Sequence, residues 1–219
     1  MLAILGGTCA ELSLVIFGDA KKAAIARMYE RQGVHARQAA SGISDHFRYW
    51  TNAVSFLSRI EAVIADTCDG RATLDLLKER FEGEVHSLTR VNEKGVITYT
   101  TPYRNSIGSD ISGQEHIREI LASRKTVVSK VFRTVQGTES VAIHVPVFRG
   151  DEFKGTLGVA LDFTTVVRRF VEEIRFGESG YAFVVSLEGT ILFSPVKGHT
   201  GRKISDLFRD NPSALAMAR

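Results

Sequence analysis

The chain has 219 residues, of which 44% are hydrophobic, so it can bury the core of one large or two small domains. This composition excludes a disordered or low-complexity chain. The net charge is only +3, from 28 basic and 25 acidic residues spread along the chain, which excludes the basic footprint of a nucleic-acid-binding protein. Cys9 and Cys68 lie far apart and form no CxxC pair, so neither a structural zinc site nor a disulfide framework is predicted.

The first 18 residues are apolar apart from Glu11 and small polar residues, which is the lower limit for crossing a bilayer of about 30 Å. We therefore interpret residues 1–19 as a candidate membrane anchor. Two observations oppose this interpretation: Glu11 is costly inside a bilayer, and the basic residues Lys21, Lys22, Arg27 and Arg31 follow the apolar run. Such a flank would hold the downstream chain in the cytoplasm. The alternatives are a remnant of a longer segment and a helix packed on a partner.

Residues 20–82 are expected to form a helical stalk followed by a second helix. Over residues 20–65 there is no proline and little glycine, and apolar residues recur every three or four positions, which predicts a long amphipathic helix. The apolar stripe consists of Ile43, Phe47, Trp50, Val54, Leu57, Ile60 and Ile64. It indicates a homodimer through this helix, although the chain's own sheet can equally cover it. A break over 66–70 precedes a second helix over 73–81, capped by Thr73.

Strand-like segments follow, and together with a helix they define a unit over residues 83–175. Strands are predicted over 85–91, 96–100, 126–135, 140–148 and 154–162, with Gly95 in the first turn. A loop over 102–110 leads into a helix that starts at Ser112 or Gly113 and runs through Leu121. A further helix over 164–175 ends the unit. These elements predict a five-stranded antiparallel sheet that is open on one face to a ligand or partner.

A degenerate repeat links this unit to the C-terminal part of the chain. Residues 91–112 align with residues 185–205 through one single-residue gap, so that Gly95 falls on Gly189 and Gly108 falls on Gly201. The spacing of about 93 residues is too long for a solenoid repeat and fits a duplicated small α+β unit. Each copy predicts a strand, a glycine turn, a strand and a loop into a helix.

The second copy, over residues 176–219, is shorter than the first. It predicts strands over 181–186 and 190–194 and a short helix over 204–208, without counterparts of the three later strands. We expect either that the sequence is a fragment of a longer polypeptide or that another element completes this unit.

Four blocks in order carry a family resemblance. They read SIGSDISGQEHIREILASRKTVVSKVF, SVAIHVPVF, GDEFKGTLGVALDF and FGESGYAFVVSLEGTILFSP, and they resemble the double Cache sensor domains of bacterial transmembrane receptors over residues 47–205. The resemblance implies an α+β fold in which two PAS-like units sit on a long N-terminal helix. Residues 83–175 would be the membrane-distal unit and residues 176–219 a partial membrane-proximal unit.

The resemblance also implies a function and a location. It implies a sensor of small extracellular molecules, held at the inner membrane and facing the periplasm or exterior. The output would lie beyond this chain, in a histidine kinase, a chemotaxis helix bundle or a diguanylate cyclase type of domain. In this family the pocket lies in the distal unit, between the sheet and its connecting loop and helix.

Candidate ligand-binding residues lie at strand ends and in that loop and helix. They are Tyr99, Tyr103, Gln114, His116, Arg118, Ser129, His144 and Asp162. Structural explanations remain open for several of them. A histidine in an apolar strand is often a hydrogen-bonded core residue, Tyr99 aligns with Phe193 in a position that wants a ring, and Arg118 suits a solvated helix face.

The start of the helix argues against a typical amino-acid ligand. Amino-acid-binding members of the family carry an Arg and then Trp-Tyr there, where this chain has Gln114, His116 and Ile117. Those members also place an Asp on the last strand, where this chain has Ala160. Because an α-amino acid would be poorly compensated, a small carboxylate or another polar metabolite is predicted instead. No cofactor or metal is predicted.

Enzymatic activity is not predicted, because the sequence has no GxSxG, HExxH or P-loop and no cysteine placed with a histidine base. Two other hypotheses remain beside the sensor. One is a cytoplasmic PAS-type module for dimerisation or partner binding without a small ligand, which the basic flank after the apolar run favours. The other is a solute-binding or scaffold protein without signalling output.

Overall fold

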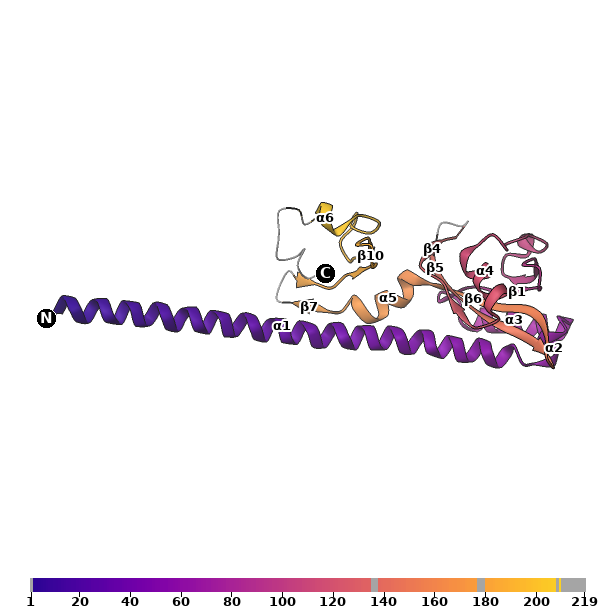
Figure 1. The fold of residues 1–219 in the computed structure, drawn as a ribbon, viewed down its shortest axis with the longest axis horizontal. Coiled ribbons are helices and arrows are strands. Elements are labelled where there is room, and N and C mark those ends of the chain that lie inside the picture. Colours follow the sequence, from indigo (N-terminus) through magenta and orange to yellow (C-terminus); the bar gives the residue numbers. More distant parts are fainter. Residues whose placement is uncertain (1, 135–137, 177–179, 208, 210–219) are drawn as a thin grey trace.

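A single long helix organises the whole molecule. The computed structural model describes residues 2–134, 138–176, 180–207 and 209, with side chains described from Phe17 onward. Helix α1 (Leu2–Leu57) has 56 residues and so spans about 84 Å at 1.5 Å per residue. Two smaller units lie along one flank of α1, the sheet unit at the end farthest from the N terminus and the other nearer its middle (Figure 1). The α+β class with a long N-terminal helix is therefore confirmed.

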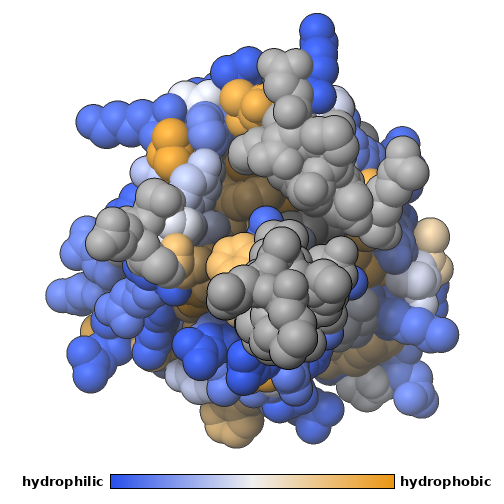
Figure 2. Space-filling model, turned by 90° about the vertical axis from the view of Figure 1, so that its left-hand side faces the viewer, coloured by the Kyte–Doolittle hydropathy of each residue, from blue (hydrophilic) through white to orange (hydrophobic). Residues whose placement is uncertain are grey.

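Helix α1 begins before the predicted stalk and runs through the predicted anchor. Within the part of the chain that the structure describes, no helix is both long and apolar enough to cross a bilayer. The predicted anchor depends mainly on the side chains of residues 1–16, which the structure does not describe. Seen along the long axis from the N-terminal end, hydrophilic residues make up most of the outline, and hydrophobic residues lie near the centre and at a few places on the edge (Figure 2).

The predicted apolar stripe packs on the chain's own sheet. Trp50 and Val54 are fully buried in the main core, together with Leu57, and Ile60 and Ile64 pack against the same core. Helix α1 ends at Leu57, and the short α2 (Glu61–Ile64) follows it. Because the sheet covers the stripe, the stripe gives no support for a homodimer.

The next helix, α3 (Cys68–Arg80), begins earlier than predicted. Its N-cap is Thr67, whose side chain accepts a hydrogen bond from the backbone of Gly70 at 3.4 Å. Thr73 lies inside the helix and donates to a carbonyl in the preceding turn, so its predicted capping role was wrong. Gly70 lies inside α3 and does not interrupt the helix. A Cβ there would lie 2.1 Å from the carbonyl oxygen of Ala62, so glycine lets α3 pack closely on α2.

The first unit contains one antiparallel sheet. Its strands are β1 (Val85–Val91), β2 (Ile97–Thr101), β3 (Val127–Val128), β4 (Phe132–Arg133), β5 (Glu139–Arg149) and β6 (Glu152–Asp162). The order is β2-β1-β6-β5-β3, and β4 also pairs with β5. The predicted strand over 126–135 is thus two short pieces. Between them the Ser129 hydroxyl accepts the Ala142 N–H at 2.9 Å, so a side chain interrupts the backbone ladder.

The connecting helices differ from the prediction mainly at their ends. The loop after β2 contains the 3-10 turn η1 (Arg104–Ser106), and α4 (Glu115–Ser123) starts after Gln114 rather than at residue 112 or 113. Helix α5 (Phe163–Val171) is capped by Asp162, which accepts the Thr165 N–H at 2.7 Å, and it ends four residues before the predicted boundary.

The hairpin and loop of the second unit have the same backbone hydrogen bonds as those of the first unit. Its elements are β7 (Arg175–Phe176), β8 (Gly180–Tyr181), β9 (Val184–Val185), β10 (Ile191–Phe193) and α6 (Ile204–Leu207); the predicted helix end at 208 lies outside the described residues. In the first unit the Gly108 N–H donates to Ile97 and the Ile111 N–H donates to Gly95. In the second the Gly201 N–H donates to Ile191 and the Ile204 N–H donates to Gly189, at matching lengths of 2.8 and 2.9 Å. The repeat read from the sequence is therefore a repeat of main-chain geometry.

Candidate ligand-binding site

A cavity of about 310 Å³ opens on the sheet face that does not pack on α1. Neighbouring strand residues point to opposite faces, so Ile143 and Val145 enter the main core while Ala142 and His144 line the cavity. The loop after β2 and helix α4 enclose it. The complete lining is His86, Ser87, Thr89, Ile97, Thr100, Tyr103, Ser106, Ser109, Ile111, Gln114, His116, Phe132, Arg133, Thr134, Ala142, His144 and Ala160.

Small residues on β5 and β6 make room for this cavity. Ala142 pairs with Ala160, and His144 pairs with Gly158 in the adjacent register. A Cβ at Gly158 would lie 2.3 Å from the His144 ring, so the glycine leaves the space that the imidazole occupies. The sheet can therefore accommodate the His144 side chain in a strand that is otherwise tightly packed.

Two imidazoles, those of His116 and His144, lie next to each other in the cavity. The His116 ring stacks on Phe132 with centroids 5.4 Å apart and lies 5.4 Å from the His144 ring. His144 Nδ1 is 3.1 Å from the buried Thr156 hydroxyl. Burial, and secondarily the nearby His116, lowers the pKa of His144 to about 3. Burial also lowers the pKa of His116, although Glu115 opposes this change, so both rings are neutral at neutral pH.

A second aromatic pair forms the side of the cavity next to the loop. Tyr103 and His86 have ring centroids 5.0 Å apart, and Tyr103 Oη is 3.4 Å from His86 Nδ1. The other ring nitrogen of His86 is buried and has no hydrogen-bond partner among the described residues. Burial raises the pKa of Tyr103, which therefore remains a neutral donor. This side of the cavity offers polar groups to a ligand.

The charge of the lining is one-sided. Among the described residues that line the cavity, none is acidic, and Arg133 carries a permanent positive charge. The remaining polar groups are hydroxyls, imidazoles and the Gln114 amide, which forms no capping bond to α4. The arrangement suits a ligand rich in hydrogen-bond acceptors.

The loop that carries Tyr103 is tied to α3 by a small network. The Arg104 guanidinium donates to both Asp75 oxygens, at 2.6 and 2.7 Å, and lies 4.3 Å from the centroid of the Tyr99 ring. Tyr99 donates to the same carboxylate. Burial opposes ionisation of Asp75, but hydrogen bonds from Thr101, Tyr99 and Arg104 outweigh it and hold the pKa of Asp75 below its usual value.

The structure brings together four of the eight predicted site residues: Tyr103, Gln114, His116 and His144. The other four do not line the cavity. Tyr99 lies on the opposite face of β2, and Arg118 is exposed on α4. Ser129 and Asp162 accept hydrogen bonds from backbone N–H groups, Ser129 from Ala142 and Asp162 from Thr165 at the start of α5.

Sequence reasoning missed the contribution of β1. His86 and Ser87 are consecutive, yet both line the cavity, because the pairing of β1 with β6 shifts register between Val85 and Ser87. A strict alternation cannot place both residues on one face. The polar residues at 87 and 89, which flank the buried Leu88, are the signal that points to this strand.

An antiparallel sheet mounted on a long helix, with a cavity enclosed by a loop and a helix, has the architecture of a PAS-like domain with a small-molecule cavity. Residues 61–162 match the family model described as "HK/GC/Chemotaxis protein-like, sensor domain", so the chain is similar to that family over this segment. No curated protein sequence matches the chain.

Solved structures with the same fold include sensor domains of bacterial receptors. The chain is similar to the ligand-binding domain of the Pseudomonas aeruginosa amino acid chemoreceptor PctC in complex with GABA (20% identity, TM-score 0.66, covering 82% of this chain and 81% of that one). It is also similar to the sensor domain of the Vibrio cholerae histidine kinase DctB (12% identity, TM-score 0.67, 88% and 76% covered). An extracellular ligand-binding receptor from Desulfohalobium retbaense matches at 21% identity and TM-score 0.64, over 82% of this chain but 34% of that one. The chain thus spans about a third of that receptor.

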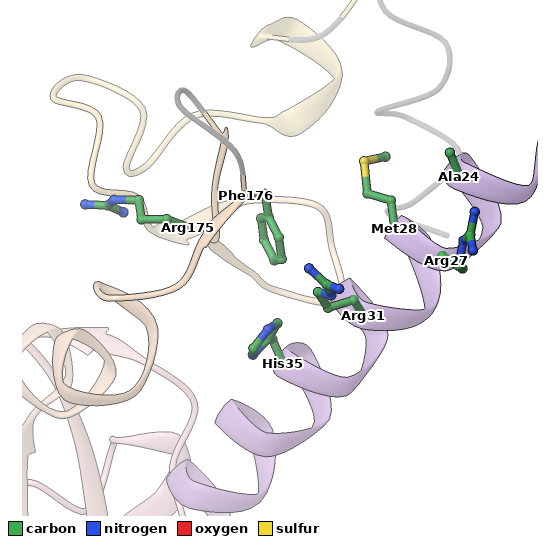
Figure 3. Close-up of a pocket in the computed structure, with 7 residues that line it drawn as sticks. All are labelled: Ala24, Arg27, Met28, Arg31, His35, Arg175 and Phe176. Carbon is green, nitrogen blue, oxygen red and sulfur yellow. The ribbon is translucent and has the colours of Figure 1, made fainter. Parts of the chain in front are cut away.

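A larger hollow of about 600 Å³ lies between α1 and β7, outside the matched segment. Figure 3 shows the Phe176 ring pointing toward Arg31 and His35, while the Arg175 side chain points away from them. His35 meets Phe176 edge-on at 6.1 Å. These contacts describe packing between α1 and the second unit, and the sheet cavity is the candidate binding site.

Proposed function

We propose that the chain is the ligand-sensing part of a transmembrane signal transducer, and that its ligand is a small carboxylate or a similar acceptor-rich metabolite. The observation that carries this proposal is the 310 Å³ cavity in the segment that matches the sensor family. A concave site with a few convergent polar groups is the usual form of a small-molecule site.

The charge of the cavity supports the ligand class. The PctC domain binds GABA, and related domains bind L-arginine, L-glutamine and L-serine, all of which carry an ammonium group. Within the described lining of this cavity no carboxylate faces the ligand space, and Ala160 leaves an apolar floor. An ammonium group buried here would lose its hydration without a counter-charge, whereas a carboxylate would meet hydroxyls, imidazoles and Arg133.

A thermal-shift experiment on the full chain tests the ligand class. The probes are acetate, pyruvate and succinate, compared with GABA and L-arginine at the same concentration and ionic strength. We expect at least one carboxylate to raise the melting temperature more than either amino compound, because only binding to the native state stabilises it. A panel in which GABA or L-arginine stabilises most would contradict the proposed ligand class.

A variant tests the site. Replacing Gln114, His116 and His144 together by alanine is expected to abolish the carboxylate-dependent shift. Arg149→Ala, which removes an exposed pair with Glu61, is a control that leaves the cavity intact. Unchanged stabilisation of the triple variant would show that these residues do not bind the ligand.

We also propose that this sensor faces the periplasm or exterior of a cell membrane. The similarity of its fold to extracellular sensor domains supports this location, and the basic residues that follow the apolar run favour the cytoplasm instead. Alkaline phosphatase fused after Arg219, in parallel with a fluorescent protein that matures in the cytoplasm, tests it. Active phosphatase supports the proposal, and cytoplasmic fluorescence alone would favour a PAS-type partner-binding module.

The predicted homodimer through the N-terminal helix requires a face other than the stripe. Ile25, Met28 and Tyr29 on α1 remain substantially exposed and offer apolar surface for such a contact. Sedimentation of the full chain over a range of concentrations tests the proposal. A monomer at every concentration, with and without a bound carboxylate, would exclude it.

A further inference from the structure

The imidazoles of His116 and His144 lie next to each other in the lining of the cavity. His116 projects from α4 and stacks on Phe132 of β4, with His144 of β5 behind it at 5.4 Å. It is less buried than His144, whose exposed fraction is 5%. Its ring therefore lies nearer to solvent and can exchange a proton more readily than the ring of His144.

Apart from Arg133, the groups around His116 provide no fixed positive charge in the described lining of the cavity. From its own helix, Glu115 faces it, but that carboxylate pairs with Lys130 at 3.2 Å at the surface. From β5 the neighbour is the neutral His144, and from β4 it is Phe132, followed by the cationic Arg133. His86 and Tyr103 line the side of the cavity formed by β1 and the loop.

We propose that the cavity binds a small carboxylate together with one proton, which His116 takes up from solvent. The proposal rests on the function proposed above and adds the way in which that site is regulated. The proton enters on one ring nitrogen of His116, and the resulting imidazolium donates a hydrogen bond to the carboxylate. No covalent bond is made or broken in the ligand.

Burial lowers the pKa of His116, so the ring is neutral when no anion is present. A carboxylate within a few ångströms favours the charged form of the ring and so raises its pKa. Between the free and bound pKa values, anion affinity then falls roughly tenfold for each unit by which the pH rises. The sensor would respond to the product of ligand and proton concentrations.

Isothermal titration calorimetry on the full chain tests this inference. The probe is whichever of acetate, pyruvate and succinate gives the largest thermal shift, titrated at pH 7 in HEPES and in Tris, whose heats of ionisation differ. We expect the apparent binding enthalpy to differ between buffers by an amount equal to uptake of about half to one proton per site. Affinity is expected to fall at least tenfold from pH 6 to pH 8.

The variant His116→Gln keeps a polar side chain but cannot take up a proton in this range. It is expected to bind the same probe more weakly at pH 6, with equal enthalpies in the two buffers. His35→Gln, which removes an imidazole from α1 outside the cavity, is the matched control and should behave like the wild type. The wild-type buffer comparison stands on its own if the His116 variant does not fold.

The outcomes separate the two proposals. Binding of a carboxylate with no buffer dependence would overturn proton uptake and leave the proposed sensor function intact. Proton uptake that persists in His116→Gln and disappears in His144→Gln would overturn the assignment to His116. Failure of every carboxylate probe to bind would overturn the proposed ligand class and this inference with it.

Discussion

The imidazole of His144 occupies the space above Gly158, its antiparallel partner on β6. A Cβ at position 158 would lie 2.3 Å from His144 Cε1, closer than real Cβ atoms approach a neighbour. The glycine and the histidine therefore depend on each other, and the floor of the cavity is built from this pair.

Gly158→Ala should lower the free energy of unfolding by about 1–3 kcal/mol, because the added methyl forces the buried ring out of its place. Urea denaturation of the full chain measures this change. Gly113→Ala is the control, since a Cβ there would meet nothing within 4 Å. In the double variant with His144→Ala, the cost of the glycine substitution should largely disappear. Strict additivity of the two substitutions would mean that the pair is not coupled.

Acid should destabilise the protein through His144. Its folded pKa of about 3 lies below the unfolded value of 6.5, so the folded state binds fewer protons than the unfolded state between these values. The contribution is fully present above pH 6.5 and declines as the pH falls toward 3, by about 1.4 kcal/mol per pH unit. Urea denaturation at pH 7, 6 and 5 measures the slope. His144→Gln should flatten it, and an equal slope in that variant would contradict the prediction.

Arg90 should be among the most costly residues to replace. Its guanidinium is 4% exposed and donates to five backbone carbonyls, those of Val63, Ile64, Val91, Lys154 and Thr156. Burial lowers its pKa, yet an arginine remains charged at any pH the fold survives.

Replacing Arg90 by Met should lower the free energy of unfolding by roughly 2–4 kcal/mol, because several carbonyls lose their donor. Arg90→Lys should recover only part of the loss, since an ammonium cannot reach carbonyls on both sides of the fork. Thermal and urea denaturation measure both variants. A Met variant as stable as the wild type would mean that water replaces the guanidinium at no cost.

Arg104→Ala should loosen the loop over 102–110 without unfolding the domain. Both partners of the Arg104–Asp75 pair are partly exposed, so the loss of stability should be below about 1 kcal/mol. Hydrogen exchange of the loop amides should quicken, and carboxylate affinity should fall several-fold because Tyr103 and Ser106 are less well held. Arg149→Ala removes a comparable exposed pair far from the cavity and should change neither quantity. Equal effects of the two variants would refute a specific role for Arg104.

The two glycine turns of the repeat should differ in their tolerance of alanine. Both Gly95 and Gly189 have positive φ values, +87° and +77°, so alanine is strained at each by about 1 kcal/mol. Only at Gly95 does the added Cβ also collide, 2.5 Å from the Cβ of Ser112, whereas at Gly189 the nearest atom is 3.7 Å away. Gly95→Ala should therefore lower the melting temperature more than Gly189→Ala. A larger fall in melting temperature for Gly189→Ala than for Gly95→Ala would contradict the prediction that the turn at Gly95 is more tightly packed.

The helices and strands were predicted well from the sequence where a hydrophobic pattern extended over many consecutive residues. The apolar spacing from Ile43 to Ile64 predicted a helix and the face that it buries, and β1, β5 and β6 lie within about two residues of their predicted bounds. Helix starts were less accurate. Thr73 and Thr67 are both reasonable caps in a sequence, and the choice depends on the contact of Gly70 with α2, which is a tertiary feature.

The candidate site was half predicted for a similar reason. Gln114, His116 and His144 were found from their place in a helix entry and a strand, and they do lie together. His86 was missed because a register shift in β1 decides which way it points, and no local pattern reports that shift. Tyr99 was proposed for the site because it lies at a strand end next to the loop, yet its hydroxyl binds Asp75 on the opposite face.

The hydrogen bonds that the two hairpins share join only backbone atoms, such as those of Gly95 and Ile111 in one unit and of Gly189 and Ile204 in the other. The shape of the loop is therefore inherited separately from the side chains that it displays. Substitutions between positions 103 and 114 can alter what the cavity recognises while the main chain keeps its path. A lineage of such domains can thus exchange one stimulus for another through point mutations, with no need to evolve a new fold.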